Sequence, residues 1–188
     1  EGRLQEALRG DESFADLLDR QVKALTPSAQ RILSIAAVMG KEFDLFMLAS
    51  VADAPFSEVL AVSTDAVGRR LLWRNPKAGL YCFAHDEIHQ QLCDLIAPPT
   101  QRRLHLKSAA YLEKQTPLHL FALAYHYDAA DRGDLAFQTA MSAASQARSR
   151  FALAVARDQL YIAQRWVHSG DRQIGLEINE GLAEIDLL

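Results

Sequence analysis

Cysteine is scarce in this chain, and so are long apolar runs. Only Cys82 and Cys93 occur in 188 residues, and neither has a CxxC partner or a histidine-rich neighbourhood. That usage fits a reducing, cytoplasmic setting and gives no reason to expect a metal site. No stretch approaches the ~18 consecutive apolar residues of a membrane helix, and no signal peptide is recognisable. We therefore predict neither a metal centre nor a membrane partner.

Glycine-rich phosphate loops are missing as well. The nine glycines are scattered, none stands in a G-x-x-x-x-G-K-[ST] segment, and several only end helices. The sequence has no nucleophile elbow and no set of Cys, His and Asp at catalytic spacing. We therefore predict that the chain is not an enzyme and holds no cofactor on its own. Because it starts with Glu1 rather than Met, we expect it to be part of a longer protein.

Basic residues are not in excess. The net charge is -4, with a pI near 5.9, and 49% of the residues are hydrophobic. This composition is typical of a globular protein, and it argues against a strong nucleic-acid binder, which normally carries a basic face. At this length the chain can form one large or two small domains, each with its own core.

Two local basic clusters still need an interpretation. Arg69, Arg70 and Arg74 surround Trp73, as residues that bind DNA phosphates would, but a solvated helix end with Trp73 in the core is the favoured alternative. Arg102 and Arg103 stand at an expected helix start, where positive charge opposes the helix dipole. They would face either an acidic partner surface or solvent.

Helical periodicity covers most of the chain. Thr26-Pro27 is a typical helix start, Gly40 a typical end, and Pro98-Pro99 an expected stop. We expect Val59, Leu60, Val62, Val67 and Leu71 to form the buried face of the fourth helix. The predicted helices span 13–25, 26–40, 44–51, 55 or 57 to 72, 87–96, 100–114, 116–130, 135–148, 151–168 and 172 to the end.

One segment departs from this helical pattern. Two short apolar runs, Leu71–Arg74 and Leu80–Phe83, flank the turn-rich connector Asn75–Gly79. They predict a two-stranded antiparallel wing, with all β-structure confined to residues 71–84. His85 then falls at a strand-to-helix corner, and Asp86 can serve as the helix N-cap or as a first-turn acid.

From Leu118 onward, small residues alternate with large ones. Alanines recur where paired helices must approach closely, and aromatic residues such as Tyr127 and Trp166 lie between them. This alternation is typical of tetratricopeptide-like (TPR-like) repeats, although no strict 34-residue period can be counted. A plain helical bundle is the alternative.

Several of these segments together resemble STAND-type signalling ATPases, the superfamily of apoptosome, NLR and bacterial multidomain regulators. Residues 25–43 resemble the segment L-x-P-x-x-Q-x-x-L-x-x-A-A-x-x-G-x-x-F that follows the ATPase core. Phe83-Ala84-His85-Asp86 resembles the aromatic-x-His-Asp at the exit of the wing. Gln101–His105 resembles the R-R-x-L-H that opens the next helix, and Ala124–Tyr127 resembles the A-x-H-Y of the first repeat. Gln101 departs from the first Arg, and Ala84 stands where plant and animal members have Met or Leu.

The resemblance implies a mainly α protein with two domains. Residues 1–97 would form a winged-helix domain, preceded by a short linker helix, and residues 98–188 would form TPR-like antiparallel helical repeats. In this family the histidine matching His85 reaches the β-phosphate of a nucleotide bound by the upstream ATPase domain, and the following Asp keeps the turn in shape. ATP or ADP with Mg²⁺ would thus belong to the parent protein.

The expected function is a non-catalytic regulatory fragment. Its winged helix would couple the nucleotide state of the upstream ATPase domain to repeats that bind a protein or small-molecule effector. One alternative is a DNA-binding winged-helix transcriptional regulator, which requires a contiguous basic face on a helix or the wing. The other is a helical-repeat interaction scaffold, in which His85 would not be exposed for docking. His85 and His89, four residues apart, could also share a helix face as a metal pair, but no third ligand is evident.

Overall fold

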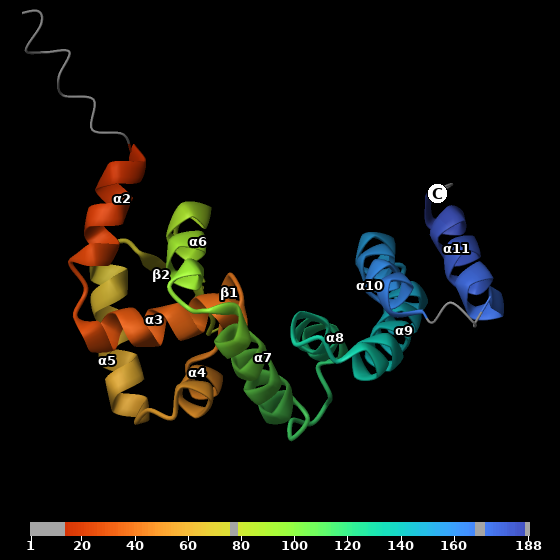
Figure 1. The fold of residues 1–188 in the computed structure, drawn as a ribbon, viewed down its shortest axis with the longest axis horizontal. Helices are drawn as coiled ribbons and strands as arrows, with labels where there is room; N and C mark the ends of the chain where they lie inside the picture. Colours follow the sequence, from red (N-terminus) through yellow and green to blue (C-terminus); the bar gives the residue numbers. More distant parts are fainter. Residues whose placement is uncertain (1–13, 76–78, 168–171, 187–188) are drawn as a thin grey trace, which may run out of the picture. The chain divides into compact units, whose positions relative to one another are not determined.

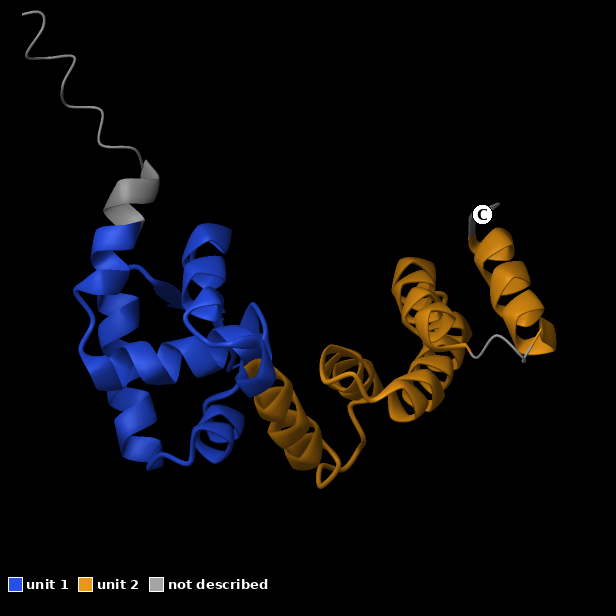
Figure 2. Ribbon diagram, viewed as in Figure 1, with its two compact units in different colours: residues 1–100 blue, residues 101–188 orange. Residues whose placement is uncertain are grey.

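The computed structural model describes residues 14–75, 79–167 and 172–186. Within these ranges the protein is mainly helical, as predicted, with one small antiparallel sheet (Figure 1). The chain divides into two compact units, unit 1 with residues 1–100 and unit 2 with residues 101–188 (Figure 2). The predicted domain boundary, between residues 97 and 98, lies at the start of helix α7.

Unit 1 combines helices with the sheet. It begins with the helices α2 (Phe14–Lys23) and α3 (Pro27–Met39). Strand β1 (Glu42–Phe43) and the helices α4 (Leu45–Ala52) and α5 (Phe56–Gly68) follow. The unit then continues with the strands β2 (Leu72–Arg74) and β3 (Tyr81–Phe83) and the helix α6 (Asp86–Asp94).

The predicted helix boundaries around α3 are confirmed by its capping bonds. The Thr26 hydroxyl accepts the Ala29 N–H at 3.2 Å, and Pro27 is the first helical residue. Gly40 ends the helix with φ at +140°, a conformation that side chains disfavour. Asp44 caps α4 and accepts the N–H groups of Phe46 and Met47 at 2.8 and 2.9 Å.

The sheet has a strand that the sequence did not reveal. The two predicted strands pair with each other, but β3 also pairs with β1, so the order is β1-β3-β2. The expectation that residues 71–84 contain all the β-structure is therefore wrong. Two residues are too few to show alternation, so only the pairing of Glu42 with Cys82 and of Phe43 with Tyr81 identifies β1.

Backbone hydrogen bonds join the two ends of the connector between β2 and β3. The Asn75 N–H donates to Leu80 at 2.8 Å, and the Gly79 N–H donates to Asn75 at 2.9 Å. Gly79 has φ at +70°, which glycine adopts without strain. Residues 76–78 of the predicted connector lie outside the described residues.

Large apolar side chains fill the interior of unit 1, including Ile32, Leu33, Leu48, Phe83, Ile88 and Leu92. The predicted buried face of α5 needs correction, because Leu60 and Val67 are 41% and 36% exposed. The helix buries Val59, Ser63 and Ala66 instead, a face that includes small and polar residues and is therefore hard to read from hydrophobicity. Leu71 is buried, but it lies beyond the end of α5.

Unit 2 is built from helices in the described part of the chain. They are α7 (Pro98–Leu112), which begins just before the unit boundary, then α8 (Leu120–Ala129), α9 (Gly133–Ser149), α10 (Leu153–Trp166) and α11 (Arg172–Asp186). Pro98-Pro99 begins α7 instead of only ending α6, because the first turn of a helix does not need the N–H that proline lacks. Thr100 is therefore not the N-cap. The predicted start at Thr116-Pro117 is also wrong, since α8 begins after His119.

Small side chains allow the helices of unit 2 to pack closely. Five alanines of α9 are at most 2% exposed between α8 and α10: Ala136, Ala140, Ala143, Ala144 and Ala147. At one end, Asp128 of α8 accepts the Trp166 indole N–H at 2.7 Å and pairs with Arg165 of α10 at 2.5 Å. These contacts tie α10 back to α8.

No helix in the described ranges is by itself long and apolar enough to cross a bilayer. Only α4 and α5 joined together, across a bend of 119°, reach the required length and composition.

Candidate functional site

His85 lies at the corner between β3 and α6, where the sequence placed it. It occupies the N-cap position with extended backbone angles, φ −140° and ψ 144°, and its side chain is exposed. Within the described residues, the imidazole does not cap the first turn of α6. The ring is therefore presented at the surface of unit 1 rather than used to terminate the helix.

Contacts on both sides fix the backbone of this corner. The Phe83 N–H donates to the Lys41 carbonyl at 3.1 Å, and the Ala84 N–H donates to the Leu71 carbonyl at 2.9 Å. Residues that lie far apart in the sequence thus clamp the two residues that precede His85. These bonds fix the point on the backbone from which the His85 side chain projects.

Asp86 is a first-turn acid and not the N-cap. Its Oδ1 atom lies 2.6 Å from the Lys41 Nζ atom, in an ion pair that connects the segment after α3 with the start of α6. The hydrogen bond from Lys41 lowers the pKa of the Asp86 carboxyl below its usual value, and the same contact raises the pKa of Lys41. Both side chains of the pair are exposed, so we expect the pair to contribute little to stability.

His89 has a structural role. Its Nε2 atom lies 2.9 Å from the Ala37 carbonyl oxygen, and its ring packs on Phe83 with centroids 5.3 Å apart. The Nε2 atom of His89 is engaged with the end of α3, so this atom is not presented as a ligand beside His85. In the described ranges, no group of three or more His, Cys, Asp or Glu side chains is arranged to hold a metal ion.

The surface next to His85 is acidic. Asp86 and Glu87 stand in the first turn of α6, and with Gln90 and Gln91 they line a shallow hollow. Carboxylates at a helix start compete with an incoming anion for the positive end of the helix dipole. The corner is therefore a poor phosphate site by itself.

The first basic cluster differs from the favoured expectation. Trp73 is 47% exposed on β2, so the prediction that it lies in the core is wrong. Arg74 lies 6.0 Å from the centroid of the Tyr81 ring, and Arg69 pairs with Asp65 at 2.7 Å. Arg70 is exposed and has φ at +61°. Part of the charge of this cluster is thus neutralised inside unit 1.

The second cluster is also partly paired within its own unit. Arg102 lies 2.8 Å from the Asp131 carboxylate at the turn between α8 and α9. Arg103 lies next to it on α7 and is exposed. Attraction to Asp131 offsets the unfavourable position of Arg102 near the helix start, so an acidic partner is not needed to explain this residue.

Unit 2 contains two polar pairs that the sequence did not predict. The Nδ1 atoms of His105 and His126 lie 2.9 Å apart, and both side chains are buried. Burial lowers the pKa of His105 to about 4, and burial together with the neighbouring His105 lowers the pKa of His126 to about 3. The Tyr127 hydroxyl donates to Glu113. Burial, and to a smaller extent this hydrogen bond, raises the pKa of Tyr127 to about 12.

Comparison with protein-family models, with curated proteins and with solved structures finds no match to this chain. Function is therefore proposed from the residues, their geometry and the sequence resemblance.

Proposed function

We propose that the chain is a non-catalytic regulatory part of a STAND-type ATPase. Unit 1 would act as its winged-helix domain and unit 2 as the first of its TPR-like repeats. The partner of unit 1 is the ATPase domain that the resemblance places upstream, which would hold ATP or ADP with Mg²⁺. The observation that most supports this proposal is the exposed His85 ring at the corner between β3 and α6. Hydrogen bonds to Lys41 and Leu71 hold the backbone just before it.

The order of elements supports the winged-helix part of this proposal. Helices α3, α4 and α5, with β1 between the first two, are followed by the hairpin of β2 and β3. A wing on a three-helix core has this order. The capping of α3 by Thr26 and Gly40 also agrees with the segment that carries the resemblance.

The chemistry of His85 suits a phosphate sensor. An imidazole can donate a hydrogen bond to a phosphate oxygen without carrying a permanent charge. Such a contact to the β-phosphate would exist in the closed, ADP-bound state and be lost when the domains separate. A ligand shifts a two-state equilibrium only by interactions that differ between the states, and this contact is of that kind. The exposure of His85 also favours the regulator over a scaffold in which this residue has no docking role.

A DNA-binding regulator is less well supported. Helix α5, which precedes the wing, carries Glu58 and Asp65 and has no Lys or Arg between Phe56 and Gly68. In the described residues, the basic side chains that directly follow α5 are Arg69, Arg70 and Arg74, and Arg69 is paired with Asp65. We expect duplex DNA to bind no more tightly than about 10⁻⁶ M near physiological salt, the range of non-specific association.

The proposal is tested in the protein extended through its ATPase domain. His85→Ala should speed the release of bound ADP by about ten- to a hundredfold, since a charge-assisted hydrogen bond contributes about 1.5–3 kcal/mol. Signalling output in the absence of effector should rise with it. His119→Ala removes another exposed histidine, located in unit 2, and serves as the control. If His85→Ala leaves release and output unchanged while the protein stays folded, the sensor role is wrong.

A further inference from the structure

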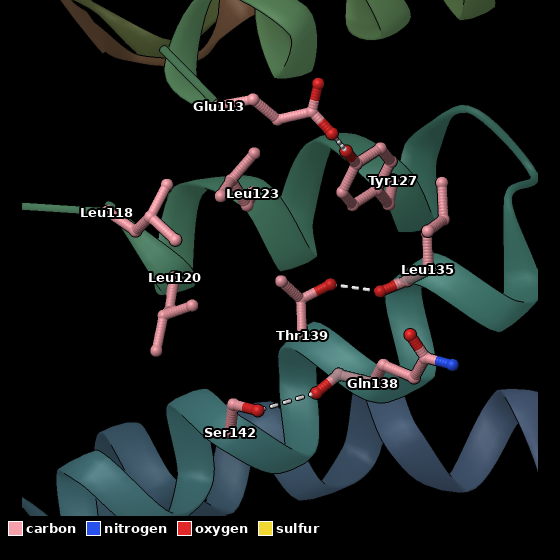
Figure 3. Close-up of a pocket in the computed structure, with 9 residues that line it drawn as sticks. All are labelled: Glu113, Leu118, Leu120, Leu123, Tyr127, Leu135, Gln138, Thr139 and Ser142. Atoms are coloured by element: carbon pink, nitrogen blue, oxygen red, sulfur yellow. Dashed lines mark hydrogen bonds between the residues drawn. The ribbon is translucent and has the colours of Figure 1, made fainter. Parts of the chain in front are cut away.

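A hollow in unit 2 lies between the segment before α8, α8 itself and the first half of α9 (Figure 3). Its volume is about 400 Å³, within the range of about 300–1,000 Å³ that holds small ligands. Four leucines form its apolar walls, namely Leu118, Leu120, Leu123 and Leu135. All residues that line it belong to unit 2.

The three hydroxyl groups of this hollow are bonded in the same way. The hydroxyls of Tyr127, Thr139 and Ser142 each donate their hydrogen inside the protein. Tyr127 donates to Glu113, Thr139 to the Leu135 carbonyl, and Ser142 to the Gln138 carbonyl at 3.0 Å. Because a hydroxyl has one hydrogen, each of the three oxygens presents only lone pairs to a ligand.

Glu113 adds charge to these acceptors. The bond from Tyr127 occupies one of roughly four lone-pair sites on the carboxylate, so further donors can be accepted. Glu113 is the one charged residue among those that line the hollow. The amide of Gln138 is the only side chain there that still has hydrogens to donate.

We propose that this hollow binds a small organic cation, with an ammonium group at Glu113 and an apolar body against the leucines. An ammonium group has three N–H donors and no acceptor, which complements a wall of acceptors. An anionic ligand would meet Glu113 without a compensating cation in the lining, and a neutral alcohol would use only one donor. The inference rests on the proposed function, since it assigns a chemical class to the effector of the helical repeats.

Three probes with the same indole body test the charge preference. Tryptamine carries an ammonium group, indole-3-ethanol a hydroxyl and indole-3-propionate a carboxylate. Each is titrated into the ¹⁵N-labelled 188-residue chain, and binding is followed by amide shifts of Leu120–Leu123 and Gln138–Ser142. We expect tryptamine to shift these amides and to bind at least tenfold more tightly than the other two probes.

Matched variants locate the preference. Glu113→Gln keeps an oxygen for Tyr127 and removes the charge, so tryptamine should lose about tenfold in affinity while indole-3-ethanol is unaffected. Glu180→Gln removes an exposed charge on α11 and should change neither. Ser142→Phe places a ring in the hollow and should abolish binding of tryptamine.

Two results would overturn the inference. One is equal or tighter binding of the alcohol or the carboxylate. The other is the absence of shifts at these amides with 10 mM tryptamine in the folded chain. Neither result involves His85 or nucleotide release, so failure here is distinguishable from failure of the proposed function.

Discussion

His85 of unit 1 and the pair formed by His105 and His126 of unit 2 lie in opposite environments. In unit 1, large apolar side chains fill the interior, and His85 is exposed on a corner that backbone hydrogen bonds hold in place. In unit 2, the helices pack through alanine, and His105 and His126 are buried against each other. His85 is thus exposed at the surface of its unit, whereas His105 and His126 are bonded to each other inside theirs.

Burial and hydrogen bonding distinguish the structural pair of His105 and His126 from the exposed His85. A distance of 2.9 Å between two Nδ1 atoms corresponds to one N–H···N bond, so one ring donates and the other accepts. The accepting ring must be neutral, and burial favours the neutral form of the donating ring as well. His85 has no such requirement, because its side chain is exposed to water.

Truncating the buried pair gives the largest expected effect on stability. His126→Ala should destabilise unit 2 by about 3–5 kcal/mol, because it leaves a cavity and removes the partner of the His105 ring. Hydrogen exchange should accelerate in α7 and α8 and stay unchanged in α3 and α6. The exposed His119→Ala is the matched control. Equal acceleration in both units would contradict the assignment of this pair to the interior of unit 2.

Acid should weaken unit 2 through the same pair. The folded pKa values, about 4 and 3, lie below the usual 6.5 of histidine, so the unfolded state binds protons first as the pH falls. Stability from this source is present above pH 6.5 and declines as the pH falls from 6.5 to about 4 for His105 and to about 3 for His126. The slope is about 1.4 kcal/mol per pH unit for each histidine.

Urea unfolding at pH 7 and pH 5 measures this effect, and we expect a loss of about 2–4 kcal/mol. The double variant His105→Phe and His126→Leu should lose much less over the same interval. A wild-type chain that is as stable at pH 5 as at pH 7 would show that the rings are not held neutral.

The smallest effect is expected at the Lys41–Asp86 ion pair. Both side chains are exposed, so Lys41→Ala should change the unfolding free energy little. The pKa of Asp86 should rise toward its usual value, because the hydrogen bond that lowers it is lost. A ¹³C titration of the carboxyl group measures this directly. An Asp86 pKa that is unchanged in Lys41→Ala would contradict the ion pair.

Periodicity and capping residues predicted most of the helices, since those signals are local. The position of His85 could also be read from the sequence, because the apolar run of β3 stops just before it. Strand β1 could not be predicted, since two residues show no pattern. The ion pair of the neighbouring Lys41 with Asp86 was therefore missed as well. The pair of His105 and His126, and the hollow beside Glu113, depend on how separate helices pack, which no local pattern encodes.

The most direct test compares the ADP affinity of the proposed upstream ATPase domain with and without this chain. We predict that the wild-type chain strengthens ADP retention and that His85→Ala removes about ten- to a hundredfold of that gain, the value of one charge-assisted hydrogen bond. The isolated 188-residue chain should bind no ADP measurably, since it has no phosphate loop. If the His85→Ala chain, correctly folded, strengthens ADP retention as much as the wild type, His85 is not the contact that reports the nucleotide.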